Sequence, residues 1–202
     1  MRIIAGEFRG RQLLAPEGST TRPITDRVKQ SLFDILTPRI EGAIVYDVFA
    51  GTGSLGLESL SRGAAFCTFF EQDRSALSRL TQNIASLRLQ DKCRIVPGDL
   101  FKHFQRANER PHTFQEAGRP AATPASASPD LIFLDPPYRF LTDRPDELLQ
   151  LALHLTGAHM KPQTLLVFRH DAHDALALPR LTVTDQRTYG DMAIELMGMD
   201  GE

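Results

Sequence analysis

The segment from Asp130 to Tyr138 constrains the fold more than any other part of the chain. Its apolar run, residues 131–134, ends in an aspartate, two prolines and a tyrosine. A short run without an alternating polar face is typical of a strand buried on both sides in a parallel sheet. Consecutive prolines lack the N–H groups that a central strand needs, so the strand must end at Asp135. The segment therefore predicts an α/β fold with Asp135 at the carboxyl end of a central strand.

The same segment suggests a chemistry. Asp135 supplies a carboxylate oxygen, Pro136 and Pro137 hold nearby backbone carbonyls in a stiff frame, and Tyr138 adds a flat ring. Two hydrogen-bond acceptors beside a ring suit a planar group that carries an NH2 group. The alternative is a strand end followed by a proline turn without a chemical role.

Strands and helices alternate along most of the chain. Helices are predicted from Thr25 or Asp26 to Thr37, up to Arg62-Gly63, over 75–87, and after a cap at Thr142 or Asp143. Core strands are predicted at 43–47, 66–71, 94–97, 131–134 and 164–169. Residues 181–188 and 192–197 are predicted to close the fold as an antiparallel hairpin, and residues 1–15 to form a short hairpin or extended arm. This alternation indicates a parallel sheet covered by helices, with an antiparallel edge.

A glycine-rich segment lies between the first predicted core strand and its helix. Residues 51–56 match the pattern G-x-G-x-x-G, and Glu71 lies 20 residues beyond Gly51, at the end of the next strand. Glycines allow a tight turn close to a ligand, and a carboxylate at Glu71 can accept both hydroxyls of a ribose. Alone, this pattern suits a nicotinamide dinucleotide equally well. Two features favour S-adenosylmethionine: Asp99, which is placed to receive an adenine amine, and the Asp-Pro-Pro-Tyr segment. The alternative is that Asp47, Glu71 and Asp99 only end strands or cap helices.

Composition narrows the class of protein. The 202 residues fit one domain. The first residues do not resemble a signal peptide, and no apolar run approaches the roughly 20 residues that span a membrane. Cys67 and Cys93 are expected to be reduced and buried, so we expect a cytoplasmic protein. His170 and His173 are interpreted as part of a solvated loop, and no metal site is predicted.

Charge is unevenly distributed along the chain. The net charge is −2, but residues 1–29 hold six basic and three acidic groups, a local charge of +3. A basic arm on an acidic body is a candidate surface for phosphates, although a merely solvated surface has the same composition. The candidate phosphate contacts are Arg9, Arg11, Arg22 and Arg27.

Residues 106–129 contain four prolines and many small residues. Almost no apolar periodicity is present, so this segment cannot bury enough surface to order itself. We expect a mobile surface loop inserted before the strand at 131–134.

Four segments resemble the RsmD-type methyltransferases, which methylate the exocyclic N2 of a guanine in small-subunit ribosomal RNA. The matching segments are residues 2–11, residues 22–29 with Phe33, residues 47–58 continuing through 61–64, and residues 130–138. The resemblance covers most of the chain. The N-terminal segments are its most specific part, because Asp-Pro-Pro-Tyr occurs in many amino-methyltransferases.

The resemblance implies a class I methyltransferase fold: a seven-stranded, mostly parallel Rossmann-like sheet with a terminal antiparallel hairpin and a short N-terminal extension. It divides the chain into an RNA-contacting arm and helix, 1–38, and a methyltransferase domain, 39–202. Its implied cofactor is S-adenosylmethionine. Its implied partner is 16S ribosomal RNA in a small subunit or an assembly intermediate, and we expect a monomer that does not bind membranes.

The resemblance also implies roles for individual residues. The methionine end of the cofactor would lie against Asp47, Ala50, Gly51 and Gly53, its ribose at Glu71 and its adenine at Asp99. The target base would be held by Asp135, Pro136 and Tyr138.

Three other functions compete with this prediction. A DNA adenine-N6 methyltransferase presents an NH2 group to the same motif, but the chain shows no separate domain for reading a sequence. A nicotinamide-dependent dehydrogenase would use the glycine loop and Glu71, and would leave Asp-Pro-Pro-Tyr without a role. A non-catalytic RNA-binding assembly factor is opposed by the presence of both Asp135 and Tyr138.

Overall fold

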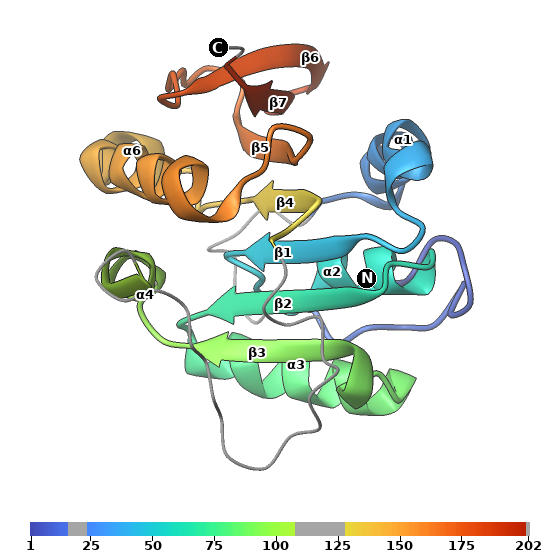
Figure 1. Cartoon of the computed structure of the whole chain (residues 1–202). Helices are drawn as coiled ribbons and strands as arrows, with labels where there is room; N and C mark the ends of the chain where they lie inside the picture. The colour runs from blue at the N-terminus through green and yellow to red at the C-terminus, as the bar shows by residue number, and fades with distance from the viewer. Residues whose placement is uncertain (16–23, 108–127, 201–202) are drawn as a thin grey trace.

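A computed structural model describes residues 1–15, 24–107 and 128–200 of the chain (Figure 1). One seven-stranded sheet has the strand order β3-β2-β1-β4-β5-β7-β6. Its strands are β1 (Ile44–Val48), β2 (Phe66–Glu71), β3 (Cys93–Pro97), β4 (Leu131–Leu134), β5 (Leu165–Asp171), β6 (Leu181–Tyr189) and β7 (Met192–Met199). The first five run parallel, whereas β7 is antiparallel to both β5 and β6. The predicted class I Rossmann-like fold with a terminal hairpin is therefore confirmed.

One helix, α1 (Asp26–Leu36), precedes the first strand, and the others connect consecutive parallel strands. These are α2 (Ser54–Ser61), α3 (Arg74–Leu87), α4 (Leu100–Ala107), α5 (Phe140–Asp143) and α6 (Pro145–His154). Short 3-10 turns follow α1 (η1, Thr37–Arg39) and precede β3 (η2, Gln90–Lys92), and a π-helical turn extends α6 (η4, Leu155–His159). Among the described residues, no helix is both long enough and apolar enough to cross a membrane.

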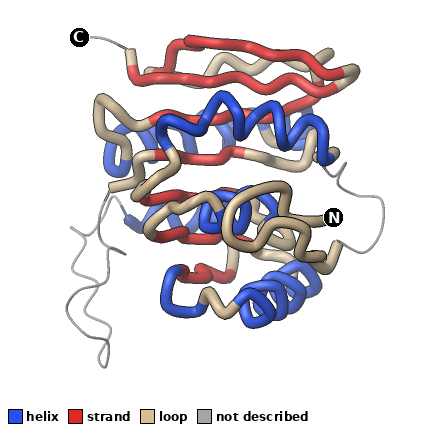
Figure 2. The backbone as a smooth tube through the Cα atoms, turned by 90° about the vertical axis from the view of Figure 1, so that its right-hand side faces the viewer, coloured by secondary structure: helices blue, strands red, loops and turns tan. Residues whose placement is uncertain are grey.

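Helices lie on both sides of the sheet (Figure 2), and a hydrophobic cluster fills the space on each side. One joins Leu32 of α1, Leu57 of α2 and Leu80 of α3 to inward-facing strand residues such as Val45. The other joins Phe104 of α4 and Leu151 of α6 to residues of the opposite strand face, such as Ile132. Because successive strand residues point to opposite faces, the central strands β1, β2 and β4, which are buried along their whole length, pack against both clusters.

Local signals set several helix ends. The Thr25 hydroxyl accepts a hydrogen bond from the Val28 N–H (3.3 Å) and caps α1, as predicted. Asp73 caps α3 through the Ala76 N–H (2.8 Å), so α3 begins at Arg74, one residue before the predicted start. Gly63 follows α2 with a φ of +102°, the left-handed conformation expected of a glycine at a helix end.

Helix α4 was not predicted. Its buried residues Leu100, Phe101 and Phe104 lie on one face and pack against the sheet. Most of the predicted mobile segment, residues 108–127, lies outside the described residues.

The N-terminal arm, residues 1–15, forms the expected hairpin-like turn, with an antiparallel bridge between Arg2 and Gln12. Its buried residues Ile3 and Leu13 belong to the same hydrophobic cluster as α1 and the central strands. Cys67 and Cys93 are both buried thiols, as expected, and the Cys93 thiol donates to Leu89 O (3.2 Å).

Candidate active site

The predicted site residues at the strand ends meet at one edge of the sheet. In the parallel register, Val48 lies beside Phe70 and Leu134, and Leu134 lies beside Phe168. The residues that follow these positions therefore lie side by side at the carboxyl edge, toward which the arrowheads of β1–β4 point in Figure 1. Ligands of open α/β sheets bind at this edge.

Asp47 lies beneath the glycine loop and is only 2% exposed. Its Oδ2 accepts a hydrogen bond from the Gly56 N–H (2.9 Å), in the first turn of α2. Burial raises the pKa of Asp47 to about 8, in spite of this hydrogen bond. In this structure, Asp47 therefore supports the loop from below.

The glycines of the loop have different roles. Gly51 has a φ of +56°, and a Cβ added there would meet no atom within 4 Å, so the loop is open at this point. Gly53 has a φ of +86°, and a Cβ there would lie 2.5 Å from Leu80 Cδ1 of α3. The Gly53 N–H donates to the carbonyl of the buried Ala50 (2.8 Å), which closes the turn. Gly53 thus permits close packing, whereas Gly51 leaves room for a ligand.

Glu71 ends β2 and is bound to backbone groups on both of its oxygens. Oε2 accepts from the Gly51 N–H (2.7 Å), and Oε1 accepts from the N–H groups of Gln72 (2.7 Å) and Asp73 (2.8 Å). Glu71 therefore ties the glycine loop to the end of β2. A carboxylate oxygen can accept two hydrogen bonds, so Oε2 retains the capacity to accept one more, such as that of a hydroxyl.

Asp99 follows β3 and caps α4. Its Oδ1 accepts from the N–H groups of Phe101 (3.0 Å) and Lys102 (3.3 Å), and its Oδ2 lies 3.8 Å from Lys102 Nζ. The helix-cap role that the sequence left open is therefore present. Among the described residues, Oδ2 has a long contact with a mostly exposed lysine.

These residues suit S-adenosylmethionine. An open, side-chain-free turn at Gly51 stands beside the carboxylates of Glu71 and Asp99, which are acceptors at the ends of adjacent strands. The ligand carries matching donors, namely two ribose hydroxyls, an adenine amine and a cationic methionine end. Its binding residues remain a prediction, which the fit of donors and acceptors supports.

Asp135 continues the sheet by one residue beyond β4, because its N–H donates to Val48 O (3.3 Å). Its Oδ1 accepts a hydrogen bond from Arg169 Nε at 2.6 Å, and no described group donates to Oδ2. The carbonyls of Pro137 and Tyr138 accept from the first N–H groups of α5, whereas no described group donates to the Pro136 carbonyl. Asp135 Oδ2 and Pro136 O are thus two acceptors to which no described group donates.

Arg169 was not predicted from the sequence. It lies near the end of β5, its side chain is 9% exposed, and its guanidinium carbon lies 5.8 Å from the centre of the Tyr138 ring. The signal was a single arginine directly after the apolar run 165–168. The side chains of Asp135, Tyr138 and Arg169 form one cluster.

A buried ionic cluster joins the N-terminal arm to α2, and it too was not predicted. Glu58 accepts from the N–H groups of Ile4 (2.8 Å) and Ala5 (3.0 Å) and from Arg62 Nε (2.8 Å). Lys29 Nζ lies 3.4 Å from Glu58 Oε2 and donates to Arg2 O (2.7 Å) and Ser54 Oγ (3.2 Å). Since Ser54 lies within the glycine-rich segment and begins α2, the arm, α1 and this segment meet at these side chains.

Further along the arm, the chain approaches α2 very closely. Gly6 has a φ of +82°, and a Cβ there would lie 1.8 Å from the Ser61 carbonyl oxygen. The Glu7 N–H donates to the same carbonyl (2.7 Å). Only glycine fits here, which accounts for the Ala-Gly-Glu sequence of the arm.

The four candidate phosphate contacts lie apart. Arg27 is exposed in the first turn of α1, near the carboxyl edge, since Ser31 Oγ contacts the hydroxyl of Tyr189 at the β6–β7 turn (2.7 Å). Arg9 is exposed at the tip of the arm, and Arg11 donates to Ser86 O (2.9 Å) near the end of α3, toward the opposite edge. Arg22 lies outside the described residues.

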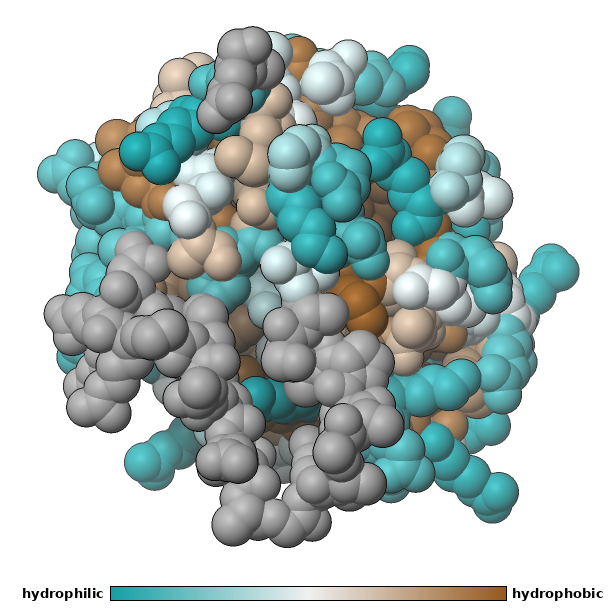
Figure 3. All heavy atoms as spheres, viewed as in Figure 1, coloured by the Kyte–Doolittle hydropathy of each residue, from teal (hydrophilic) through white to brown (hydrophobic). Residues whose placement is uncertain are grey.

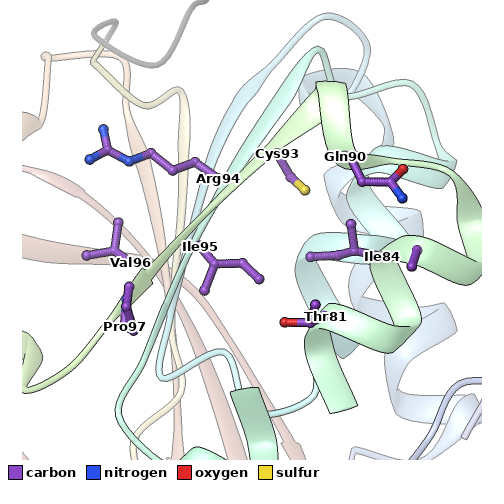
Figure 4. Close-up of a pocket in the computed structure, with 9 residues that line it drawn as sticks. Thr81, Ile84, Gln90, Cys93, Arg94, Ile95, Val96 and Pro97 are labelled. Atoms are coloured by element: carbon purple, nitrogen blue, oxygen red, sulfur yellow. The ribbon is translucent and has the colours of Figure 1, made fainter. Parts of the chain in front are cut away.

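A hollow of about 490 Å³ opens between α3 and the edge strand β3 (Figure 4). Ile95 points toward Thr81 and Ile84 of α3, while Arg94 and Val96 lie on the other side of the strand. None of the predicted site residues lines this hollow. In the view of Figure 3, polar and apolar side chains are interspersed over the described surface.

Comparisons with known proteins agree on one family. The family model described as Conserved hypothetical protein 95 matches residues 1–198. The chain is 38% identical over 139 residues to the Escherichia coli K12 protein named Ribosomal RNA small subunit methyltransferase D, covering 69% of this chain and 61% of that protein. It is 30% identical over 200 residues to the Haemophilus influenzae protein of the same name, covering 97% and 92%. The solved structure of the Escherichia coli protein yhhF matches with a TM-score of 0.76 at 27% identity, covering 100% of this chain and 99% of that one.

Proposed function

The chain belongs to the RsmD-type methyltransferase family, and from this premise we propose that it methylates the exocyclic N2 of a guanine in small-subunit ribosomal RNA. The observation that carries the proposal is the pair of open acceptors, Asp135 Oδ2 and Pro136 O, beside the Tyr138 ring. They lie at the same sheet edge as the glycine loop. We further propose that the protein acts in the cytoplasm, on 16S ribosomal RNA in a small subunit or an assembly intermediate.

The cofactor, S-adenosylmethionine, supplies a methyl group that its positive sulfur already activates. The chain's own contribution is then mainly positioning and electrostatics. Glu71 and Asp99 would hold the ribose and the adenine. Asp47, Ala50, Gly51 and Gly53 would form the turn against which the methionine end rests, with Asp47 acting through the loop that it supports.

The target base would be held from two directions. A guanine amine is a weak nucleophile because its lone pair is delocalised into the ring. Acceptance of one N–H by Asp135 Oδ2 and the other by the Pro136 carbonyl favours a pyramidal nitrogen, whose lone pair then points toward the methyl group. Tyr138 would stack on a base turned out of its helix, an interaction worth about 1–3 kcal/mol.

Basic residues would hold the RNA backbone. Arg27 lies near the carboxyl edge, so we propose that it contacts phosphates next to the target nucleotide. Arg9 and Arg11 lie toward the other edge and would contact a more distant part of the RNA, together with Arg22 of the same N-terminal region. Such contacts position a nucleic acid without reading its sequence.

The test is the identity of the methylated nucleoside. The protein is incubated with tritiated S-adenosylmethionine and small ribosomal subunits from cells that lack it, and the RNA is digested to nucleosides. Label in N2-methylguanosine is the expected result. Label in N6-methyladenosine would replace the target base, and absence of label from a cofactor-binding protein would favour the assembly-factor alternative.

A further inference from the structure

Arg169 is a buried charged residue that directly follows the apolar run of β5. The four residues before it, 165–168, are buried, and Arg169 itself is 7% exposed. A buried cation is costly unless a partner compensates it. The chain must therefore place a carboxylate against this position, or lose stability.

The sheet register supplies that carboxylate. Leu134 of β4 lies beside Phe168 of β5. The next residues, Asp135 and Arg169, therefore also lie side by side. Neighbouring residues in such a register point to the same face of the sheet. The resulting contact is short, 2.6 Å from Arg169 Nε to Asp135 Oδ1, as expected of a charge-assisted hydrogen bond.

Other side chains confine the guanidinium. Nη1 lies 3.9 Å from the sulfur of Met192 on β7, and the Tyr138 ring is on another side. Burial opposes the charge, but Asp135 outweighs it, so the pKa of Arg169 lies above its ordinary value. The arginine is thus a fixed cation, and the aspartate beside it can rotate only by breaking the contact.

We propose that Arg169 is a positioning residue for the methyl transfer, whose guanidinium holds Oδ1 of Asp135 so that Oδ2 faces the amine of the target base. This inference rests on the proposed function of Asp135. A carboxylate on a single Cβ has two torsions, and contact with the base alone would have to fix both. Arg169 fixes them before the base arrives, which is the kind of preorganisation that raises the rate of the chemical step.

Two substitutions separate positioning from mere stability. Arg169→Met removes the charge and keeps an unbranched apolar stem, whereas Arg169→Lys keeps the charge but loses the planar fork. Arg187→Met is the control, because it breaks an exposed contact with Asp185 on the neighbouring hairpin. For each folded variant, kcat, KM for the RNA and the dissociation constant of S-adenosylmethionine are measured, the last by calorimetry.

The expected result is a kcat for Arg169→Met that is lower by about 10²-fold, the usual cost of a reacting group misplaced by about 1 Å. KM and cofactor affinity should stay near their wild-type values, and Arg169→Lys should recover much of the rate. An unchanged kcat in folded Arg169→Met would overturn the proposal, and so would a parallel loss of cofactor affinity and rate.

Crystal structures of both variants provide a test without turnover. Asp135 should leave its orientation in Arg169→Met and keep it in Arg169→Lys. If Asp135 keeps the same orientation in Arg169→Met, the positioning role is wrong. If the wild-type protein labels no RNA, the proposed function fails, and these structures still decide whether Arg169 orients Asp135.

Discussion

Replacement of Glu58 by glutamine should destabilise the protein far more than disruption of a surface ion pair. Glu58 and Lys29 have side-chain exposures of 0% and 1%, so neither reaches water. Four donors converge on the two Glu58 oxygens: two backbone N–H groups of the arm, Arg62 Nε and Lys29 Nζ. Glutamine has one acceptor oxygen, and its NH2 group would face donors.

The magnitude follows from the charges that remain. In Glu58→Gln, the fully buried Lys29 and the nearly buried Arg62 both lose their carboxylate partner. Loss of one partner of a buried ion pair costs about 3–5 kcal/mol of stability. Lys29→Met should cost less. Burial lowers the pKa of Lys29 although Glu58 opposes the shift, so Glu58 does not fully offset the cost of burying the ammonium. When Lys29 is removed, Glu58 still accepts hydrogen bonds from three donors. The double variant Glu58→Gln/Lys29→Met should lose less free energy of unfolding than the two single variants lose together.

Urea unfolding measures these differences. With a slope of about 2 kcal/mol per molar urea, a loss of about 4 kcal/mol lowers the midpoint by about 2 M. Arg187→Gln serves as the control, because its exposed pair with Asp185 should contribute no more than about 1 kcal/mol. Hydrogen exchange at the Ile4 and Ala5 amides should accelerate in Glu58→Gln, since both donate to the lost carboxylate. A midpoint shift no larger than that of the control would refute the reasoning.

Three further predictions concern the site. The pKa of Asp47 is raised to about 8, so the native protein retains a proton that the unfolded chain releases near pH 4. The contribution of Asp47 to the free energy of unfolding therefore falls as the pH rises from about 4 to 8. Asp47→Asn should therefore gain stability relative to wild type across that range in urea series, and a flat difference would show that Asp47 is already ionised. Asp135→Asn should lower methyl transfer by about 10²–10³-fold with cofactor affinity retained in calorimetry, whereas equal loss of both would contradict its assignment to the base. Arg27→Gln should flatten the slope of log affinity for RNA against log salt concentration by roughly 0.7–0.9. Arg39→Gln, beyond the other end of α1, is the control and should leave the slope unchanged. If Arg27→Gln has the same slope as the wild-type protein, Arg27 does not contact the RNA.

The elements that the sequence predicted best are those with local signals. The bounds of β2 and β4 agree with the predictions because both are largely apolar runs bounded by an acidic residue, Glu71 at the end of β2 and Asp135 directly after β4. The start of α1 was predicted from Thr25, whose hydroxyl caps the helix in the structure. Helix α4 was missed because it is short and runs directly into a segment rich in proline and alanine, although Asp99 is an ordinary cap.

The parts that were missed depend on partners far apart in the chain. Arg169 meets Asp135 across 34 residues, and Glu58 meets Ile4 across 54. Periodicity places each residue on a strand or helix, but it does not say which charges will face each other across the sheet. The contact between Asp47 and the Gly56 N–H spans only nine residues, but it too depends on the folded structure, because the assembled first turn of α2 brings this N–H to the carboxylate.

The two outer strands bear on how the protein behaves at high concentration. Both end strands of a sheet expose unpaired N–H and C=O groups, to which another chain can add by strand pairing. In β6 most side chains are exposed and polar, and the pairing register with β7 shifts between Val183 and Asp185. At the other end, β3 is only five residues long and finishes at Pro97, which has no N–H to offer. A second copy would find an irregular, charged strand at one end and a short, proline-ended strand at the other, so the sheet resists growth into aggregates.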